Sequence, residues 1–406
     1  MNLITKWCTI RWEVLCLKLL KNKNEYIKKI VICLCLTISL GGSVFITKGR
    51  YDDNKNIKEE VLEASKIDTD SNTDETNNQY KLLLEHLFDY RNKAILDQNE
   101  EILKELYDTN KKFGLWAYEH EVKKMKYIKS WSDKQGVDFK DIKTKVIVKK
   151  IKEKEEDLYG IICTVSTEYK YSYENQKDVI NTFRIGTYHY LNVVIRDNQY
   201  VIVKEWYTDP FEDSLNLENI NSNEIRNYIE NHEKAEIQLT KEQEKAINYA
   251  HQYCGAAADE EFGLKFNNKY KDFNPDGGDC ANFASQILFE SGRFKKNATW
   301  NYCNGDGTKA WVNAQGFKNY MLNSGRGSLI AKGSYNDVYK EAYNLRPGDF
   351  VGYEKGGRIT HVSTVTGQDS KGYPLVTCHN TDRLLVPWDL GWSNKAIRFH
   401  LIKVNY

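Results

Sequence analysis

The sequence of 406 residues predicts an α+β fold, with two folded domains behind an apolar N-terminal segment. Three observations support this prediction. The length is sufficient for two or three ordinary domains. In the first half, apolar residues with helical spacing are followed by a series of β-type runs. In the second half, a predicted helix again precedes predicted strands, which is typical of an α+β arrangement.

Composition excludes several classes of protein. Lys and Arg number 58 against 57 Asp and Glu, and a net charge of +1 argues against a nucleic-acid partner. At 41% hydrophobic and 13% aromatic residues, the chain is globular rather than disordered. A mean hydropathy of −0.65 excludes a multi-span membrane protein. Because no short-period repeat is present, fibrous and solenoid folds are excluded as well.

The N-terminus contains a predicted membrane segment. Residues 1–29 form a basic tail, and residues 30–47 are an apolar run without charge. As a helix the run would be about 27 Å long, enough for a bilayer core. The preceding lysines predict a cytoplasmic N-terminus and an exterior location for the rest. We expect a membrane-anchored protein, or a secreted one if signal peptidase cleaves near Ser39 and Gly41; the apolar residues that follow favour a retained anchor.

The first folded domain is predicted over residues 80–214, after a polar linker at residues 48–79. Helical spacing runs from Tyr80 to about Met125. The predicted strands cover residues 143–151, 159–173, 179–196 and 200–206. This order of helices and an antiparallel meander resembles the nuclear-transport-factor-like and cystatin-like folds. The domain contains no catalytic constellation, so both a binding role and a spacer role remain open.

The second domain is predicted over residues 240–406, after a connector at residues 215–239. Thr240 and Gln243 form a capping-box pair that begins a helix. A second helix is predicted to begin at Cys280, because Asp279 is a suitable N-cap and Gly292 suits the position after the helix end.

Cys280 is the candidate nucleophile of this domain. It shares the apolar face of its helix, so its thiol points into the fold. A cysteine in the first turn lies at the positive end of the helix dipole, which lowers its pKa and favours the thiolate. The alternative interpretation is a small buried apolar residue.

Two histidines follow on predicted strands of a hairpin centred near Ser370. In that register His361 faces His379 across the hairpin, whereas a slip of one residue would place Asn380 there. A cysteine on a helix, a base on a strand and a third polar group that orients the base are the arrangement found in cysteine hydrolases.

Four motifs occur in the order expected of a known family. They are Gly278-Asp279-Cys280 with Phe283, Arg346-Pro347-Gly348-Asp349-Phe350, His361-Val362-Ser363-Thr364-Val365, and His379-Asn380-Thr381-Asp382. This order is similar to that of the NlpC-type cell-wall peptidases of the papain-like superfamily. It more closely resembles the bacterial “putative amidase domain” family, which shares their permuted papain-like core. The resemblance covers residues 240–406 and implies Cys280 as nucleophile, His361 as general base and His379 as the orienting residue.

The chemistry implied by this resemblance is amide hydrolysis without a cofactor. The Cys280 thiolate attacks an amide carbonyl, and His361 protonates the leaving amine. The backbone N–H of Cys280 and the side chain of Tyr270 are candidate oxyanion donors. Asp279 and Asn380 are further orienting candidates. An exported hydrolase would meet amide bonds in peptidoglycan peptides, so peptidoglycan or another peptide amide is the expected substrate.

Two alternative interpretations compete with the cysteine hydrolase. Cysteine and histidine are zinc ligands, but neither Cys-x-x-Cys nor His-Glu-x-x-His spacing is present, so we predict no metal site. The alternative function is a non-enzymatic wall-binding module with an inactive papain-like domain. Loss of Cys280 or His361 would have marked such a module, and both residues are present. Five cysteines lie beyond the apolar run, an odd number, and Cys280 is the expected unpaired thiol.

Overall fold

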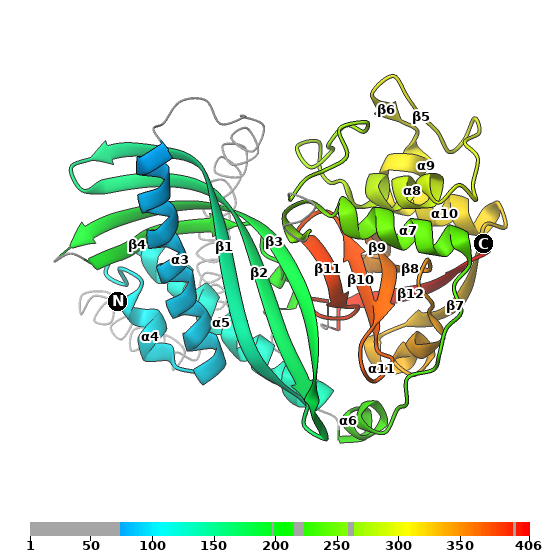
Figure 1. Cartoon of the computed structure of the whole chain (residues 1–406), viewed down its shortest axis with the longest axis horizontal. Coiled ribbons are helices and arrows are strands. Elements are labelled where there is room, and N and C mark those ends of the chain that lie inside the picture. The colour runs from blue at the N-terminus through cyan, green and yellow to red at the C-terminus, as the bar shows by residue number, and fades with distance from the viewer. Residues whose placement is uncertain (1–73, 197–198, 215–222, 259–263, 393–394) are drawn as a thin grey trace, which may run out of the picture. The chain divides into compact units, whose positions relative to one another are not determined.

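The computed structural model describes residues 74–196, 199–214, 223–258, 264–392 and 395–406 (Figure 1). The basic tail, the apolar run at residues 30–47 and most of the predicted linker lie outside these ranges. Of the helices within them, none has both the length and the apolar character needed to cross a bilayer.

The predicted α+β class is confirmed for the described residues, which contain nine α-helices and one large antiparallel sheet. The helices are α3 (Asp74–Asp97), α4 (Glu100–Glu105), α5 (Lys112–Gln135), α6 (Asn223–Glu230), α7 (Lys241–Gln252), α8 (Cys280–Glu290), α9 (Lys309–Val312), α10 (Ala314–Asn323) and α11 (Tyr335–Val338). The sheet strands are β1 (Val137–Glu155), β2 (Leu158–Tyr173), β3 (Gln176–Arg196), β4 (Gln199–Tyr207), β7 (Gly327–Gly333), β8 (Phe350–Lys355), β9 (Arg358–Gln368), β10 (Pro374–Cys378), β11 (Asp382–Pro387) and β12 (Ile397–Val404). A separate small hairpin pairs β5 (Tyr302–Cys303) with β6 (Asp306–Gly307).

The predicted order of helices and strands in the first half is confirmed, although one boundary moves. The expected helical region ended near Met125, whereas α5 continues to Gln135. It ends there because Gly136 adopts the left-handed conformation with φ 71°, which terminates a helix without strain. Strand β1 begins at the next residue, six residues earlier than expected.

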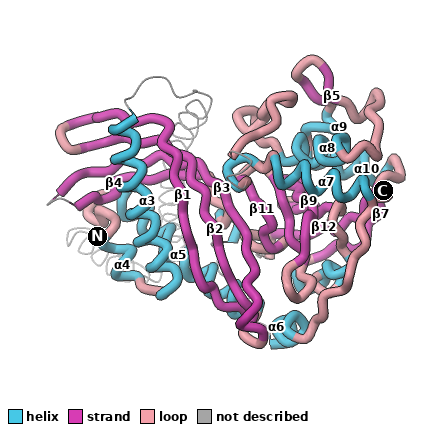
Figure 2. Tube along the Cα trace, in the orientation of Figure 1, coloured by secondary structure: helices cyan, strands magenta, loops and turns pink. Residues whose placement is uncertain are grey.

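A single sheet runs through both predicted domains. Its strand order is β1-β2-β3-β11-β10-β9-β8-β12-β7, with β4 also paired to β3 (Figure 2). The sheet can continue from the first half into the second because β3 is long. Residues 184–186 of β3 pair with β11, and residues 189–196 pair with β4. Gly186 permits the close approach of Ala256 to β3, since a Cβ at Gly186 would lie 2.5 Å from the Cβ of Ala256. The domain boundaries themselves stay a prediction.

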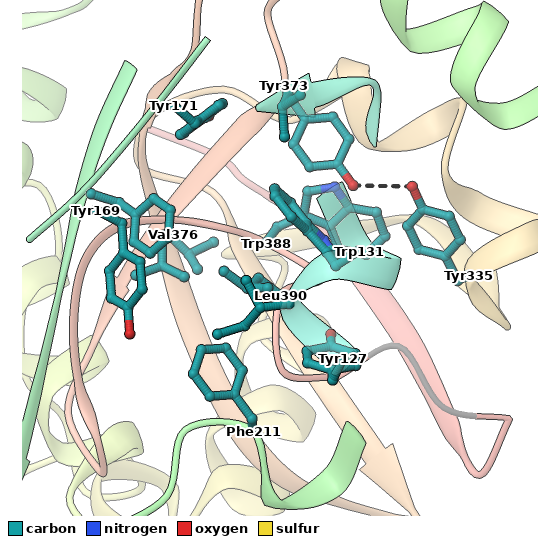
Figure 3. Close-up of a cluster of buried hydrophobic side chains, with 14 of the residues drawn as sticks. Tyr127, Trp131, Tyr169, Tyr171, Phe211, Tyr335, Tyr373, Val376, Trp388 and Leu390 are labelled. Carbon is teal, nitrogen blue, oxygen red and sulfur yellow. Dashed lines mark hydrogen bonds between the residues drawn. The ribbon is translucent and has the colours of Figure 1, made fainter. Parts of the chain in front are cut away.

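The core shared by the two halves is rich in aromatic residues. Trp131 of α5 and Tyr171 of β2 belong to the same buried cluster as Tyr335 and Trp388 from the second half (Figure 3). Phe399 of β12 belongs to this cluster as well. The hydroxyls of Tyr335 and Tyr373 lie 3.1 Å apart in this cluster (Figure 3). Helix α5 therefore contributes to the packing of the strands that follow residue 350.

The first half also contains a buried group of charged side chains. Arg91 of α3 donates to Glu205 of β4 at 2.9 Å, and His189 of β3 contacts the same carboxylate at 2.9 Å. Glu121 of α5 forms an ion pair with Lys124 at 2.8 Å. The side chains of both carboxylates are 1% exposed, so their charges depend on these cations rather than on water.

Acid is expected to destabilise the chain through these carboxylates. Burial raises the pKa values of Glu121 and Glu205, but Lys124 and Arg91 outweigh it and hold both below the ordinary 4.5. Their stabilising contribution is therefore present above about pH 4.5 and is lost as the pH falls below it. Urea unfolding from neutral pH to about pH 3 should show this decline. In Glu205→Gln the free energy of unfolding should be lower at neutral pH and depend less on pH; an unchanged pH slope would contradict the prediction.

Candidate active site

Helix α8 begins at Cys280, as predicted, and Gly292 follows its last turn in the left-handed conformation with φ 84°. The side chain of Asp279 does not cap the helix. Its carboxylate instead accepts hydrogen bonds from the backbone of Phe273 at 3.0 Å and from the side chain of Asn282 at 2.8 Å. The start of α8 is thus held by contacts to the loop before it.

The sulfur of Cys280 lies where strands β9 and β10 separate, a place that we call the β9–β10 fork. The pairing of the two strands ends at Thr364 and Thr377. Two residues earlier on β9, the backbone N–H of Val362 hydrogen-bonds the Cys280 sulfur and lowers its pKa. Burial dominates, however, and raises the pKa of Cys280 to about 12. The expected lowering by the helix start is therefore wrong for this arrangement, since loss of water outweighs it.

The register of the β9–β10 hairpin differs from the prediction. A bulge after Leu375 places Thr377 opposite Thr364. This is one residue away from the register that would pair His361 with His379. Because successive side chains on a strand point to opposite faces, the two histidines lie on opposite faces of the sheet. The prediction that they face each other is wrong.

His361 lies on the face of the sheet that carries the aromatic core. It pairs with Tyr353 of β8, and its ring stacks on Trp392 with centroids 5.1 Å apart. Its Nε2 atom lies 3.3 Å from the sulfur of Cys378. Burial, with a smaller contribution from Arg383, lowers the pKa of His361 to about 3, so the ring is neutral.

Among the described residues no hydrogen bond joins the Cys280 sulfur to the His361 ring. Cys280 packs in the same buried cluster as Val362, whereas His361 contacts Tyr353 and Trp392. Val362, whose N–H faces the Cys280 sulfur, directly follows His361 on β9. Cys378 contacts the His361 ring and also raises the pKa of Cys280 electrostatically. The sequence did not predict a role for Cys378, because its place depends on a bulge in the β9–β10 pairing at Thr366 of β9. Its position directly before His379 was the only available signal.

His379 and Asn380 hold the start of α8 rather than the ring of His361. Nδ1 of His379 lies 2.5 Å from Asp279, and Nε2 lies 2.8 Å from the backbone oxygen of Tyr253. Both partners are acceptors, so both ring nitrogens carry hydrogen. Burial lowers the pKa of His379, but bonding to Asp279 outweighs it and the pKa is raised. The ring stacks on Phe283 at 3.6 Å, and the Asn380 side chain accepts from the backbone N–H of Asp279.

These contacts correct the expected orienting roles. His379 has no ring nitrogen left for His361, and Asn380 has left the strand with φ 68°. The hydroxyl of Tyr270, the expected oxyanion donor, donates a hydrogen bond to Glu290 at 2.5 Å. Glu290 ends α8, about 15 Å along the helix from Cys280. The structure does not bring Tyr270 to the fork, so of the expected oxyanion donors only the backbone N–H at the start of α8 stays a candidate.

The other cysteines do not single out Cys280. Cys163, Cys280, Cys303 and Cys378 are free thiols in the described part of the chain, and all of them but Cys303 are buried. Cys280 is therefore distinguished by its place at the fork, not by being unpaired. Within the described ranges, no group of three or more His, Cys, Asp or Glu side chains is arranged to hold a metal ion.

Part of the second half matches a known family of protein domains. Residues 240–402 match a family model described as “Putative amidase domain”, which indicates an amide hydrolase at the level of reaction class. A Bacillus subtilis (strain 168) protein, “Uncharacterized protein YjcM”, is 34% identical over 148 residues, 33% of this chain. The match spans 32% of that relative's own length, about a third of it.

One solved structure shows a weak similarity to this chain. The intermembrane space region of the chloroplast protein ARC6 is 13% identical, with a TM-score of 0.22. The similarity covers 31% of this chain and 95% of that one.

Proposed function

We propose that this chain is an exported cysteine hydrolase that cleaves amide bonds in peptidoglycan peptides, with Cys280 as the nucleophile and His361 as the general base. The observation that carries the proposal is the position of Cys280 at the start of α8 beside Val362, the residue that directly follows His361 on β9. The fork lies inside the segment that matches the amidase family.

The reaction is acyl transfer in two stages. The thiol proton of Cys280 passes to His361, and the sulfur attacks the carbon of the amide. The C–N bond breaks as His361 returns the proton to the leaving amine. Water then cleaves the thioester and restores the thiol. The backbone N–H groups at the start of α8 stabilise the negative charge that develops on the carbonyl oxygen.

The closed fork holds a neutral thiol and a neutral imidazole. The pKa of Cys280 is raised to about 12 and that of His361 is lowered to about 3, in each case mainly by burial. Charge separation between them is therefore costly until substrate and water enter the fork and solvate both groups. This protects the nucleophile from reagents that lack the shape of the substrate.

The proposed location and substrate follow from the N-terminal segment. The apolar run at residues 30–47, preceded by lysines, directs the rest of the chain to the cell exterior. The amide bonds most abundant there belong to the peptides of the cell wall. A retained anchor would keep the hydrolase beside the membrane face of the wall.

The proposal is tested by incubating the full chain with purified peptidoglycan and identifying the released fragments by mass spectrometry. We expect new amino termini, and their identity names the bond that is cut. Cys303→Ser is the matched control for substitutions of Cys280, because Cys303 is an exposed thiol in the β5–β6 hairpin. It should release the same fragments as the wild type. Binding to the wall without any released fragment would favour the non-enzymatic wall-binding module instead.

A further inference from the structure

We infer that Cys378 is the residue that orients the imidazole of His361, in the role that resemblance to known hydrolases gives to His379. The inference rests on the proposed function and names a further positioning residue for the same site. Its basis is the contact of 3.3 Å between Nε2 of His361 and the sulfur of Cys378. The hairpin register places the two side chains on the same face of the sheet.

The other residues that could orient the ring are engaged elsewhere. His379 uses one ring nitrogen for Asp279 and the other for the backbone oxygen of Tyr253. The Asn380 side chain accepts from the backbone N–H of Asp279. One bulge in β9, at Thr366, therefore shifts the orienting position by a single residue, from His379 to Cys378.

The direction of this contact decides which ring nitrogen can act as a base. For His361 to take a proton, one nitrogen must be bare while the other keeps its hydrogen. If Nε2–H donates to the Cys378 sulfur, Nδ1 is the bare nitrogen. Burial raises the pKa of Cys378 to about 11, so this residue stays a neutral thiol and adds no charge beside the ring.

The sulfur of Cys378 also has a hydrogen-bond donor nearby. Ser363 lies two residues after His361 on β9, and its hydroxyl lowers the pKa of Cys378. A hydrogen bond that lowers the pKa of a thiol is donated to its sulfur, so the Ser363 hydroxyl is the donor in this contact. The sulfur of Cys378 is therefore contacted by both His361 and Ser363. Since sulfur is a weak acceptor, the ring is held less firmly than by a carboxylate.

The test compares Cys378→Ala, which removes the acceptor, with Cys378→Ser, which keeps one. The matched control is Cys163→Ala, which removes another buried free thiol from a strand in the first half. All three are made in the full chain. The first readout is the ¹⁵N spectrum of labelled histidine, with the His361 signals identified by their loss in His361→Gln. The second is the pH dependence of kcat on peptidoglycan fragments.

We expect the wild type and Cys163→Ala to show His361 protonated on Nε2, and Cys378→Ala to show a mixture of both tautomers. In Cys378→Ala kcat should fall about tenfold with KM unchanged, and its pH profile should shift. Cys378→Ser should recover most of the wild-type kcat and most of the wild-type pH profile. If Cys280→Ala abolishes hydrolysis while Cys378→Ala matches Cys163→Ala in tautomer and kcat, this inference alone is overturned. If Cys280→Ala hydrolyses normally, the proposed function fails, whichever tautomer is found.

Discussion

Cys280→Ala should abolish amide hydrolysis while leaving the fold intact. Removing the nucleophile of a hydrolase costs roughly 10⁴-fold or more in kcat, because binding groups and oxyanion donors provide only the remainder. The side chain is buried at 6% exposure, and alanine at the start of α8 fills most of its volume. We expect the free energy of unfolding to change by only about 1 kcal/mol. The measurement is the initial rate of fragment release at saturating peptidoglycan.

Two further variants separate loss of the thiolate from loss of shape. Cys280→Ser keeps the volume but offers a much weaker nucleophile, so it should also lose nearly all activity. Cys303→Ser, at the exposed thiol, should retain it. A Cys280→Ala rate within about tenfold of the wild type would rule out Cys280 as the nucleophile.

Breaking the ion pair between Lys134 and Asp389 should cause the largest loss of stability. Both side chains are 0% exposed, one on α5 and the other in the loop after β11. Asp389 also accepts from Trp131 at 3.2 Å and from Tyr373 at 2.7 Å, and the Lys134 ammonium lies 3.9 Å from the centre of the Tyr335 ring. Lys134→Met leaves the carboxylate buried without its cation. The expected cost is about 3–5 kcal/mol of the free energy of unfolding in urea.

The matched control is Lys129→Met, which breaks the ion pair with Asp133 on the exposed face of the same helix. That change should cost about 0.5 kcal/mol or less. The double variant Lys134→Met, Asp389→Leu should recover much of the loss, because it removes both buried charges. Since Lys134 and Asp389 join α5 to the second half, far-ultraviolet dichroism and tryptophan fluorescence should report one transition. A cost below about 1 kcal/mol for Lys134→Met would contradict this account.

Local signals in the sequence predicted the local structure well. Thr240 and Gln243 form both hydrogen bonds of the expected capping box. The four strands expected between residues 143 and 206 correspond to β1–β4, and α8 begins at Cys280. These features depend on residues within a few positions of each other, so composition and spacing were sufficient to find them.

Contacts between distant segments could not be predicted in the same way. The pairing of β3 with β11 joins residues almost two hundred positions apart, and its only signal was an isolated glycine, Gly186, inside a strand. The bulge after Leu375 moved Cys378 into the place expected of His379. Tyr270 was chosen for its chemistry, but the fold commits its hydroxyl to Glu290. Register and burial are tertiary properties, so they override expectations based on residue type.

The most direct test of the central claim is to trap the acyl-enzyme. The full chain is mixed with peptidoglycan fragments, quenched in acid within the first turnovers and digested, and the peptide that contains Cys280 is examined by mass spectrometry. We predict a thioester-linked fragment on Cys280 that accumulates before steady state and is absent from Cys280→Ala. Turnover by the wild type without any adduct on Cys280 under these conditions would contradict the proposed mechanism.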